Sequence, residues 1–189
     1  MIEKKGSAMR KLLLLSMALF MTVPAFGHGD ALTRETLKKF FPEADNFVSR
    51  KKSFTSQQLK QVAQAAEDAV QAVDKELTVF VALGKDPQTN KMQSLGAVLM
   101  VDAKGLKGSI DMAVGYKLDG SVKKVLIIEN GDAKELESEA FLAQLEGKSP
   151  SDSWDLEHDF KLVKPSVSAQ AVIRAVRRGM YLFLAFKGE

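Results

Sequence analysis

The stretch "IDMAVGYKLDGSVKKVLIIE", residues 110–129, contains the pattern that decides the fold. Two β-type runs, 110–117 and 122–129, flank the tetrapeptide Leu118-Asp119-Gly120-Ser121. An Asp-Gly pair between two such runs is a strong hairpin signal, because both residues tolerate the positive φ angles of a tight turn. The stretch therefore predicts two antiparallel strands joined by a short turn.

β-type sequence continues upstream of this hairpin. The segments 76–83 ("ELTVFVAL") and 92–103 ("MQSLGAVLMVDA") are strand candidates, and the turn signal "PQTN" at 87–90 separates them. Residues 104–109 ("KGLKGS") form a glycine-punctuated loop or bulge, and 46–54 ("NFVSRKKSF") is a further strand candidate with its basic residues in solvent. Together these segments predict an antiparallel sheet.

Two helices are predicted in the N-terminal part of the chain, one on each side of the strand candidate at 46–54. Thr33 is placed as the N-cap of a helix over 34–41, which stops before Pro42. Thr55 and Gln58 form a capping-box pattern, and the helix that follows keeps its apolar periodicity to residue 73.

Two more helices are predicted towards the C-terminus, over 133–147 and from about Ser166 to about Lys187. The apolar residues of the last helix share one face: Val172, Ala175, Val176, Gly179 and Phe183. Its arginines are predicted towards the other face: Arg174, Arg177 and Arg178. The fold class is therefore α+β, an antiparallel sheet packed with helices and ending in a long C-terminal helix.

The first 27 residues have the pattern of an export signal. Met9-Arg10-Lys11 supplies the positive end, residues 12–23 the apolar core, and Ala25-Phe26-Gly27 the small residues that precede a cleavage site. The apolar run is short for a transmembrane helix, which needs about 20 residues. Cleavage near Gly27 and a periplasmic location are predicted, and an uncleaved anchor is the alternative.

Composition excludes several kinds of function. Of 27 Lys and Arg and 24 Asp and Glu, the first 27 residues hold four basic and one acidic residue, so the remainder is balanced and gives no case for nucleic acid binding. The absence of cysteine excludes disulfides, thiolate metal sites and thiol catalysis. His28 and His158 are too far apart in sequence to predict a metal site, and no G-x-S-x-G or triad pattern predicts catalytic residues.

The start of the last helix is a candidate anion site. The stretch "KPSVSAQAVIRAV", residues 164–176, places Lys164 and the hydroxyls of Ser166 and Ser168 at a helix N-terminus. Free backbone N–H groups and the helix dipole suit a phosphate there, and ordinary serine capping is the alternative.

Four glycines recur through the central strands and their connections: Gly105, Gly108, Gly115 and Gly120. Glycines in this pattern mark either plain turns and bulges or the close approach of another group to the backbone.

In this order, the motifs resemble the FMN-binding domain family. This family includes the periplasmic flavin-carrying subunits of the sodium-pumping quinone reductase and of the Rnf electron-transport complex, and many small exported flavoproteins. Residues 105–129 are similar to its glycine-rich strand pair, and "FLAQLEGK" (141–148) to its Phe-x-x-Gln-x-x-Gly-Lys pattern. "VKPSVSAQAVIRAV" (163–176) resembles its last helix, which follows a Ser-Gly-Ala-Thr-x-Thr/Ser signature, and "LTRETLKKFFPEAD" (32–45) its N-terminal extension.

The resemblance implies a domain organisation and a function. The parts are a signal peptide (1–27), a helix-strand-helix extension (28–91) and an FMN-binding domain (92–189). The function implied is that of an exported electron-transfer flavoprotein of a respiratory chain, more an electron carrier than an enzyme with its own turnover. Its partners would be membrane or periplasmic electron carriers.

The resemblance also implies a site. The phosphate of FMN would lie at Ser166, which has the position of the family's flavin-linked threonine. A separate flavin transferase makes the covalent link in such members, and covalent and non-covalent binding both stay open here. The cofactor-binding residues implied are Ser166, Ser168, Lys164, Gly105, Gly108 and Glu129.

A degenerate, flavin-free member with a structural or interaction role is the alternative. Val163-Lys164-Pro165 stands where the family has Ser-Gly-Ala. Small residues let the backbone approach a phosphate, whereas proline fixes φ and lacks an N–H. The loop "ENGDAKEL" (129–136) keeps only Glu129 of the Glu-Thr-Pro-Gly-Leu-Gly sequence of many members.

Overall fold

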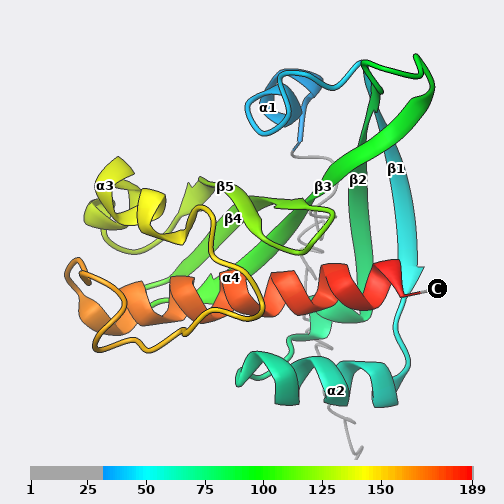
Figure 1. Ribbon diagram of the computed structural model, residues 1–189. Helices are drawn as coiled ribbons and strands as arrows, with labels where there is room; N and C mark the ends of the chain where they lie inside the picture. Colours follow the sequence, from blue (N-terminus) through cyan, green and yellow to red (C-terminus); the bar gives the residue numbers. More distant parts are fainter. Residues whose placement is uncertain (1–31, 189) are drawn as a thin grey trace, which may run out of the picture.

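The computed structural model describes residues 32–188, and its centre is one antiparallel sheet (Figure 1). The five strands follow one another in chain order: β1 (Asn46–Ser53), β2 (Glu76–Lys85), β3 (Met92–Lys104), β4 (Ser109–Lys117) and β5 (Val122–Asn130). The predicted α+β class is confirmed. The predicted signal peptide and its cleavage site lie outside the described residues.

The turn between β4 and β5 forms as its sequence predicts. Gly120 takes a φ of +89°, which favours glycine, and its N–H donates to the carbonyl of Lys117 (2.9 Å). The carboxylate of Asp119 accepts from both the backbone N–H and the hydroxyl of Ser121. The Asp-Gly pair therefore closes the hairpin through one side-chain cap and one positive φ.

The long helix α4 (Ser166–Lys187) lies across one face of the sheet, mainly along β3, and α2 (Ser56–Ala66) packs against α4 (Figure 1). Strand side chains alternate between faces, so Val101, Met112 and Val114 all reach the core beneath α4. The predicted bounds and apolar face of the last helix are confirmed.

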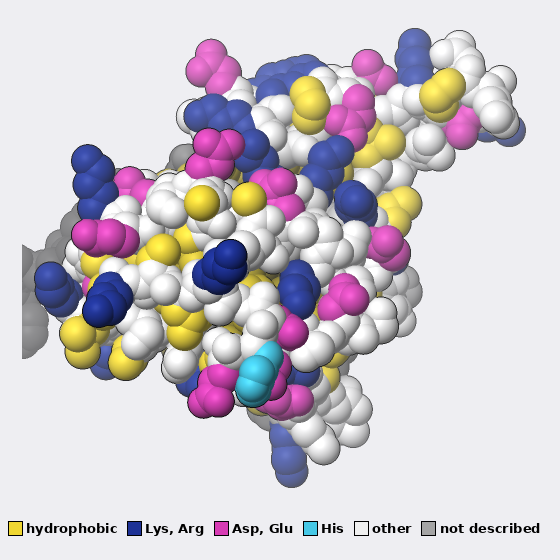
Figure 2. Space-filling view, turned by 60° about the vertical axis from the view of Figure 1, so that its left-hand side comes forward, with side chains coloured by type: hydrophobic (Ala, Val, Ile, Leu, Met, Phe, Trp, Pro, Cys, Tyr) yellow, Lys and Arg dark blue, Asp and Glu magenta, His cyan; other side chains and the backbone are white. Residues whose placement is uncertain are grey.

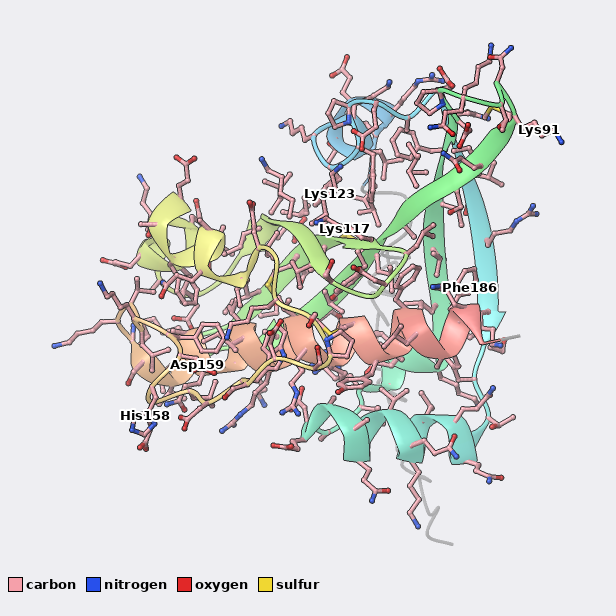
Figure 3. All side chains as sticks on the ribbon, viewed as in Figure 1. Lys91, Lys117, Lys123, His158, Asp159 and Phe186 are labelled. Carbon is pink, nitrogen blue, oxygen red and sulfur yellow. The ribbon has the colours of Figure 1, made fainter. Side chains whose placement is uncertain are left out.

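Residues 32–44, with the short helix α1 (Arg34–Lys38), cover part of the second face. Phe40 and Phe41 are buried there against glycines, since a Cβ on Gly115 would lie 2.8 Å from the Phe40 ring and one on Gly96 2.6 Å from the Phe41 ring. In Figure 3, Lys123 lies beneath this segment, where its ammonium is 2.6 Å from a carboxylate oxygen of Glu43.

Both predicted helix starts are confirmed, but both helices are shorter than their sequence patterns predict. The first, α1, ends at Lys38 and not at residue 41. The Thr33 and Thr55 side chains cap α1 and α2, and Thr55 and Gln58 form the complete capping box. However, α2 ends at Ala66, because Glu67 takes a left-handed conformation (φ 53°). A separate 3₁₀ turn, η2 (Ala72–Lys75), follows, so the prediction of one helix to residue 73 is wrong.

Arg178 explains why the chain turns away after α2. Its side chain is buried (2% exposed), with Nη1 2.6 Å from Asp68 Oδ2, Nε 3.1 Å from Asp74 Oδ2, and Nη2 donating to the carbonyl of Asp102 (2.6 Å). Arg178 is predicted to lie opposite the apolar face of the helix, and the structure buries it there against the segment that follows α2. Ion pairing draws residues 68–74 towards α4 and overrides their helical pattern.

The helix predicted over 133–147 is also broken. Three short turns replace it: η3 (Lys134–Glu137), α3 (Glu139–Leu142) and η4 (Ala143–Leu145). Ser138 is extended (ψ 127°) and its hydroxyl accepts from the N–H of Phe141 (3.2 Å), which starts a new helical turn. The apolar residues Leu136, Phe141 and Leu145 are nevertheless buried.

The sheet continues across the boundary predicted between residues 91 and 92. Strands β2 and β3 pair from Lys85↔Met92 to Val79↔Leu99, so the N-terminal extension and the main domain share one sheet. In the described part of the chain, no helix is both long and apolar enough to cross a bilayer.

Candidate functional site

The first turn of α4 is open to solvent and has no side-chain cap. After a cis Lys164–Pro165 bond, Pro165 is the N-cap residue, and its carbonyl accepts from the N–H groups of Ser168 and Ala169 (3.1 Å each). Within residues 32–188, the N–H groups of Ser166 and Val167 donate to no other group. This turn therefore presents two unused backbone donors.

The predicted residues Ser166 and Lys164 both lie at this open turn. Each is exposed, and neither side chain has a hydrogen bond or ion pair with the other residues of the described chain. An accessible hydroxyl, two free amides and a cation in one place are chemically suited to a phosphate group.

Ser168 is in a different environment from Ser166. It is fully buried (0% exposed), and its Oγ accepts from the N–H of Leu106 (2.9 Å), which lies 62 residues away in the loop between β3 and β4. The structure thus brings the predicted glycine loop and the start of the last helix together.

Asp132 forms the third part of this junction. Its Oδ2 accepts from the N–H of Lys107 (2.8 Å) and from the hydroxyl of Ser168 (2.9 Å). Asn130 fixes the turn that carries Asp132, because its side chain accepts from the Asp132 N–H (2.9 Å) and donates to the carbonyl of Ala133 (3.0 Å). Burial raises the pKa of Asp132, but the hydrogen bonds from Lys107 and Ser168 outweigh it, so the net pKa is lowered.

The glycines of the loop are explained by contacts within the chain. A Cβ on Gly105 would collide with Oδ2 of Asp132, and one on Gly108 would lie 2.5 Å from the carbonyl oxygen of Gly131. Of the two alternatives for these glycines, close approach of another group therefore applies at both positions, and that group belongs to the same chain. Both glycines are half-buried, with the turn that carries Asp132 packed close to them.

Glu129 lies apart from the serines. It is exposed on β5, directly across from Asp111 of β4, and in the described structure it has no hydrogen bond or ion pair to Ser166, Ser168 or Lys164. The structure thus places Ser168, Gly105 and Gly108 around the turn that carries Asp132, and Ser166 and Lys164 at the adjoining start of α4, whereas Glu129 bonds to none of these side chains.

A depression of about 540 Å³ lies beside the junction, within the size range of small-ligand sites. Its lining comes from Gln71 and from the ends of β3 and β4 with their loop: residues 102–109 and Asp111. Leu106 lines this depression and also bonds to the first turn of α4, so it connects the two features.

Two large apolar side chains are exposed at this junction, Leu106 (65%) and Val167 (60%). Figure 2 turns towards the end of the molecule where α4 begins, and there hydrophobic side chains lie exposed among charges of both signs. An apolar group can therefore dock here, but no single sign of charge dominates the face.

Sequence reasoning missed three residues of this site. Leu106 and Val167 have weak signals, a leucine inside a glycine loop and a valine off the apolar face of the last helix. Asp132 follows the turn pair Asn130-Gly131, but nothing in the sequence relates it to a serine 36 residues later.

The site is one of hydrogen-bond donors and apolar contacts. Among residues 32–188, no three His, Asp or Glu side chains are grouped so that they could hold a metal ion.

No protein-family model matches the chain, and no curated protein is significantly similar to it.

Proposed function

We propose that the protein is an exported FMN-binding electron-transfer protein, with the phosphate of FMN at the start of α4. The order of motifs that resembles the FMN-binding domain family supports this. One structural observation supports it most: the exposed Ser166 hydroxyl lies at an uncapped helix N-terminus beside the exposed Leu106 and Val167.

The residues fit the two ends of the cofactor. Ser166, the free N–H groups of the first turn and Lys164 would hold the phosphate. Leu106 and Val167 would contact the planar ring, since exposed apolar side chains gain from covering an apolar surface. Bound FMN supplies the redox chemistry of its ring, and the protein supplies binding and orientation.

Ser168, Gly105 and Gly108 have an indirect role in this proposal. They hold the loop on α4 through the Asp132 junction and so place Leu106 beside Ser166. Glu129 stays in solvent and is not needed to hold the phosphate.

Both modes of attachment use Ser166. In the covalent mode, Ser166 Oγ forms a bond to phosphorus as the pyrophosphate bond of a flavin adenine dinucleotide donor breaks. AMP then leaves, and the serine proton passes to solvent. In the non-covalent mode, the hydroxyl donates a hydrogen bond to the phosphate. Electrons would pass to membrane or periplasmic carriers.

The test is co-expression of the protein, with its signal sequence, and a flavin transferase. The visible spectrum and the intact mass of the purified protein are then measured. We expect a flavin spectrum and an FMN adduct in the wild type and in S49A, an exposed serine of β1, and loss of the adduct in S166A.

Colour without an adduct would indicate non-covalent binding, and then S166A and K164E should each raise the dissociation constant for FMN about tenfold, as expected when a charge-assisted hydrogen bond is lost. A colourless protein that binds no added FMN would overturn the proposal.

A flavin-free periplasmic module is the second candidate, and the Asp132 junction favours it. The carboxylate already uses donors of the glycine loop that a ligand would otherwise meet. This candidate expects a colourless protein whose melting temperature does not change when FMN is added, because a ligand that binds the folded state must raise it.

A further inference from the structure

We propose that the Asp132 carboxylate is a built-in anion that occupies the donor set of the β3–β4 loop and excludes external phosphate from it. This inference concerns the loop and not Ser166, so it stands whether or not FMN binds to the first turn of α4.

The donors around Asp132 are those that bind phosphate in other loops. The Lys107 N–H and the Ser168 hydroxyl both point at Oδ2, and the Leu106 N–H meets the Ser168 oxygen. The side chains of Lys104, the last residue of β3, and of Lys107 in the loop are exposed. Backbone amides, a hydroxyl and lysines around glycines form an anion-binding arrangement.

Gly105 makes the occupation possible. A Cβ at this position would collide with Oδ2, so any other residue would displace the carboxylate or the loop. The second glycine of the loop, Gly108, lets the carbonyl oxygen of Gly131 come within 2.5 Å of where a Cβ would lie, and so lets the turn that carries Asp132 pack onto the loop.

The occupied donors cannot serve a second anion. Phosphate would have to share the Lys107 N–H and the Ser168 hydroxyl with a carboxylate, and two like charges at hydrogen-bond distance repel strongly. The Ser168 hydroxyl is also withheld from ester formation, since it is buried and donates to Asp132.

The other oxygen of Asp132 makes a matched control possible. Oδ1 is buried and accepts no hydrogen bond from any described residue. An asparagine can therefore turn its amide oxygen to both donors and place its NH₂ where Oδ1 now lies. D132N keeps a side-chain oxygen that accepts from both donors, whereas D132A removes it.

The test is a titration of the ¹⁵N-labelled mature protein with inorganic phosphate at constant ionic strength, following the amide signals of Leu106 and Lys107. We expect no saturable shift in the wild type or D132N, and a saturable shift in D132A. The proposal is overturned if the wild type responds like D132A, or if a folded D132A does not respond.

A second measurement keeps the proposal testable if D132A does not fold. In S168A the Lys107 N–H still meets the carboxylate, but the Leu106 N–H loses its bond to the Ser168 oxygen. We expect hydrogen exchange of the Lys107 amide to stay slow and that of Leu106 to become fast. Fast exchange at Lys107 in the wild type and S168A would show that Asp132 does not occupy the loop.

Discussion

Two aspartates of this protein respond to their surroundings in opposite directions. Asp74 is buried (3% exposed), and burial raises its pKa more than Arg178 and the Gln71 N–H lower it. Asp132 is only partly buried, and its pKa is lowered by its hydrogen bonds. Relative to the unfolded chain, folding thus shifts the proton equilibrium of Asp74 towards the protonated form and that of Asp132 towards the ionised form.

These shifts give opposite dependences of stability on pH. The contribution of Asp74 is full below the unfolded pKa, near 3.8, and is lost as the pH rises through its raised folded value. The contribution of Asp132 is present above that unfolded pKa and is lost as the pH falls through its lowered folded value.

We therefore expect the difference in free energy of unfolding between the wild type and D74N to shrink as the pH rises from 3.8. The difference between the wild type and D132N should instead shrink as the pH falls towards and below 3.8. Urea unfolding at a series of pH values measures both differences. If the two differences changed with pH in the same direction, the opposite pKa shifts of Asp74 and Asp132 would be contradicted.

Arg178 and Arg174 provide a second comparison between single residues. Both lie on α4, but Arg178 is buried between Asp68 and Asp74 and Arg174 is exposed. We expect R178A to lower the free energy of unfolding by about 3–5 kcal/mol, because it leaves carboxylates without their cation. R174A should change it by no more than about 0.5 kcal/mol. Equal losses in chemical denaturation would show that burial of Arg178 has no special role.

The site shows what single residues can reveal from sequence alone. Ser166 and Lys164 could be selected because a proline and a hydroxyl before an apolar period mark a helix start, and α4 does begin at Ser166. Asp132 could not, because a carboxylate that ends a turn has no sequence period that relates it to Ser168. Its role depends on the packing of a loop on a distant helix.

At the scale of the elements, local chemistry predicts where they start better than where they end. Thr55 with Gln58, and Asp119 with Gly120, act through bonds to nearby residues, so their patterns are visible in sequence. The end of α2 is set by Arg178, more than a hundred residues away. The break at Ser138 could not be predicted, because the apolar spacing of this segment fits one continuous helix as well as two shorter turns separated by a serine cap.

The contact of α4 with the sheet depends on Gly179. A Cβ there would collide with the hydroxyl of Tyr116 and lie 2.8 Å from Val101 Cγ1. Alanine favours helix by about 1 kcal/mol, but overpacking costs about 1–3 kcal/mol, so we expect G179A to lose up to about 2 kcal/mol of stability. Chemical denaturation measures this change.

Y116F provides the double-mutant control. It removes the hydroxyl that donates to the Val176 carbonyl (2.7 Å), and the oxygen of this hydroxyl is the nearest of the atoms that a Cβ at position 179 would meet. G179A should therefore cost less in the Y116F background than in the wild type. If the two changes are additive, the hydroxyl is not what limits the approach of the helix.

At the scale of the whole molecule, both faces of one sheet are covered by segments from opposite parts of the chain. Residues 32–44 cover Ala82, Val98 and Ala113 on one face, and α4 covers the other. The fold class could be predicted from sequence, because alternation and hairpin signals define an antiparallel sheet. Which segment covers which face of the sheet could not be predicted, because the amphipathic pattern of a helix does not show which face of a sheet it packs against.

We expect this arrangement to make the N-terminal extension necessary for folding. A protein that starts at residue 46 exposes the apolar face that Phe40 and Phe41 cover, so it should bind a hydrophobic dye and melt at a lower temperature than one that starts at residue 32. The fragment 92–189 lacks β2 and leaves β3 unpaired along one edge, so it should not fold. Cooperative melting of either fragment at the temperature of the longer protein would contradict this expectation.

The position of α4 also has a consequence for biosynthesis. The ribosome completes all five strands before it makes the helix that covers Val101, Met112 and Val114. A nascent chain that ends before Ser166 therefore has a sheet with one bare apolar face and no stable native state. We therefore expect the protein to reach its native state only after α4 has been made.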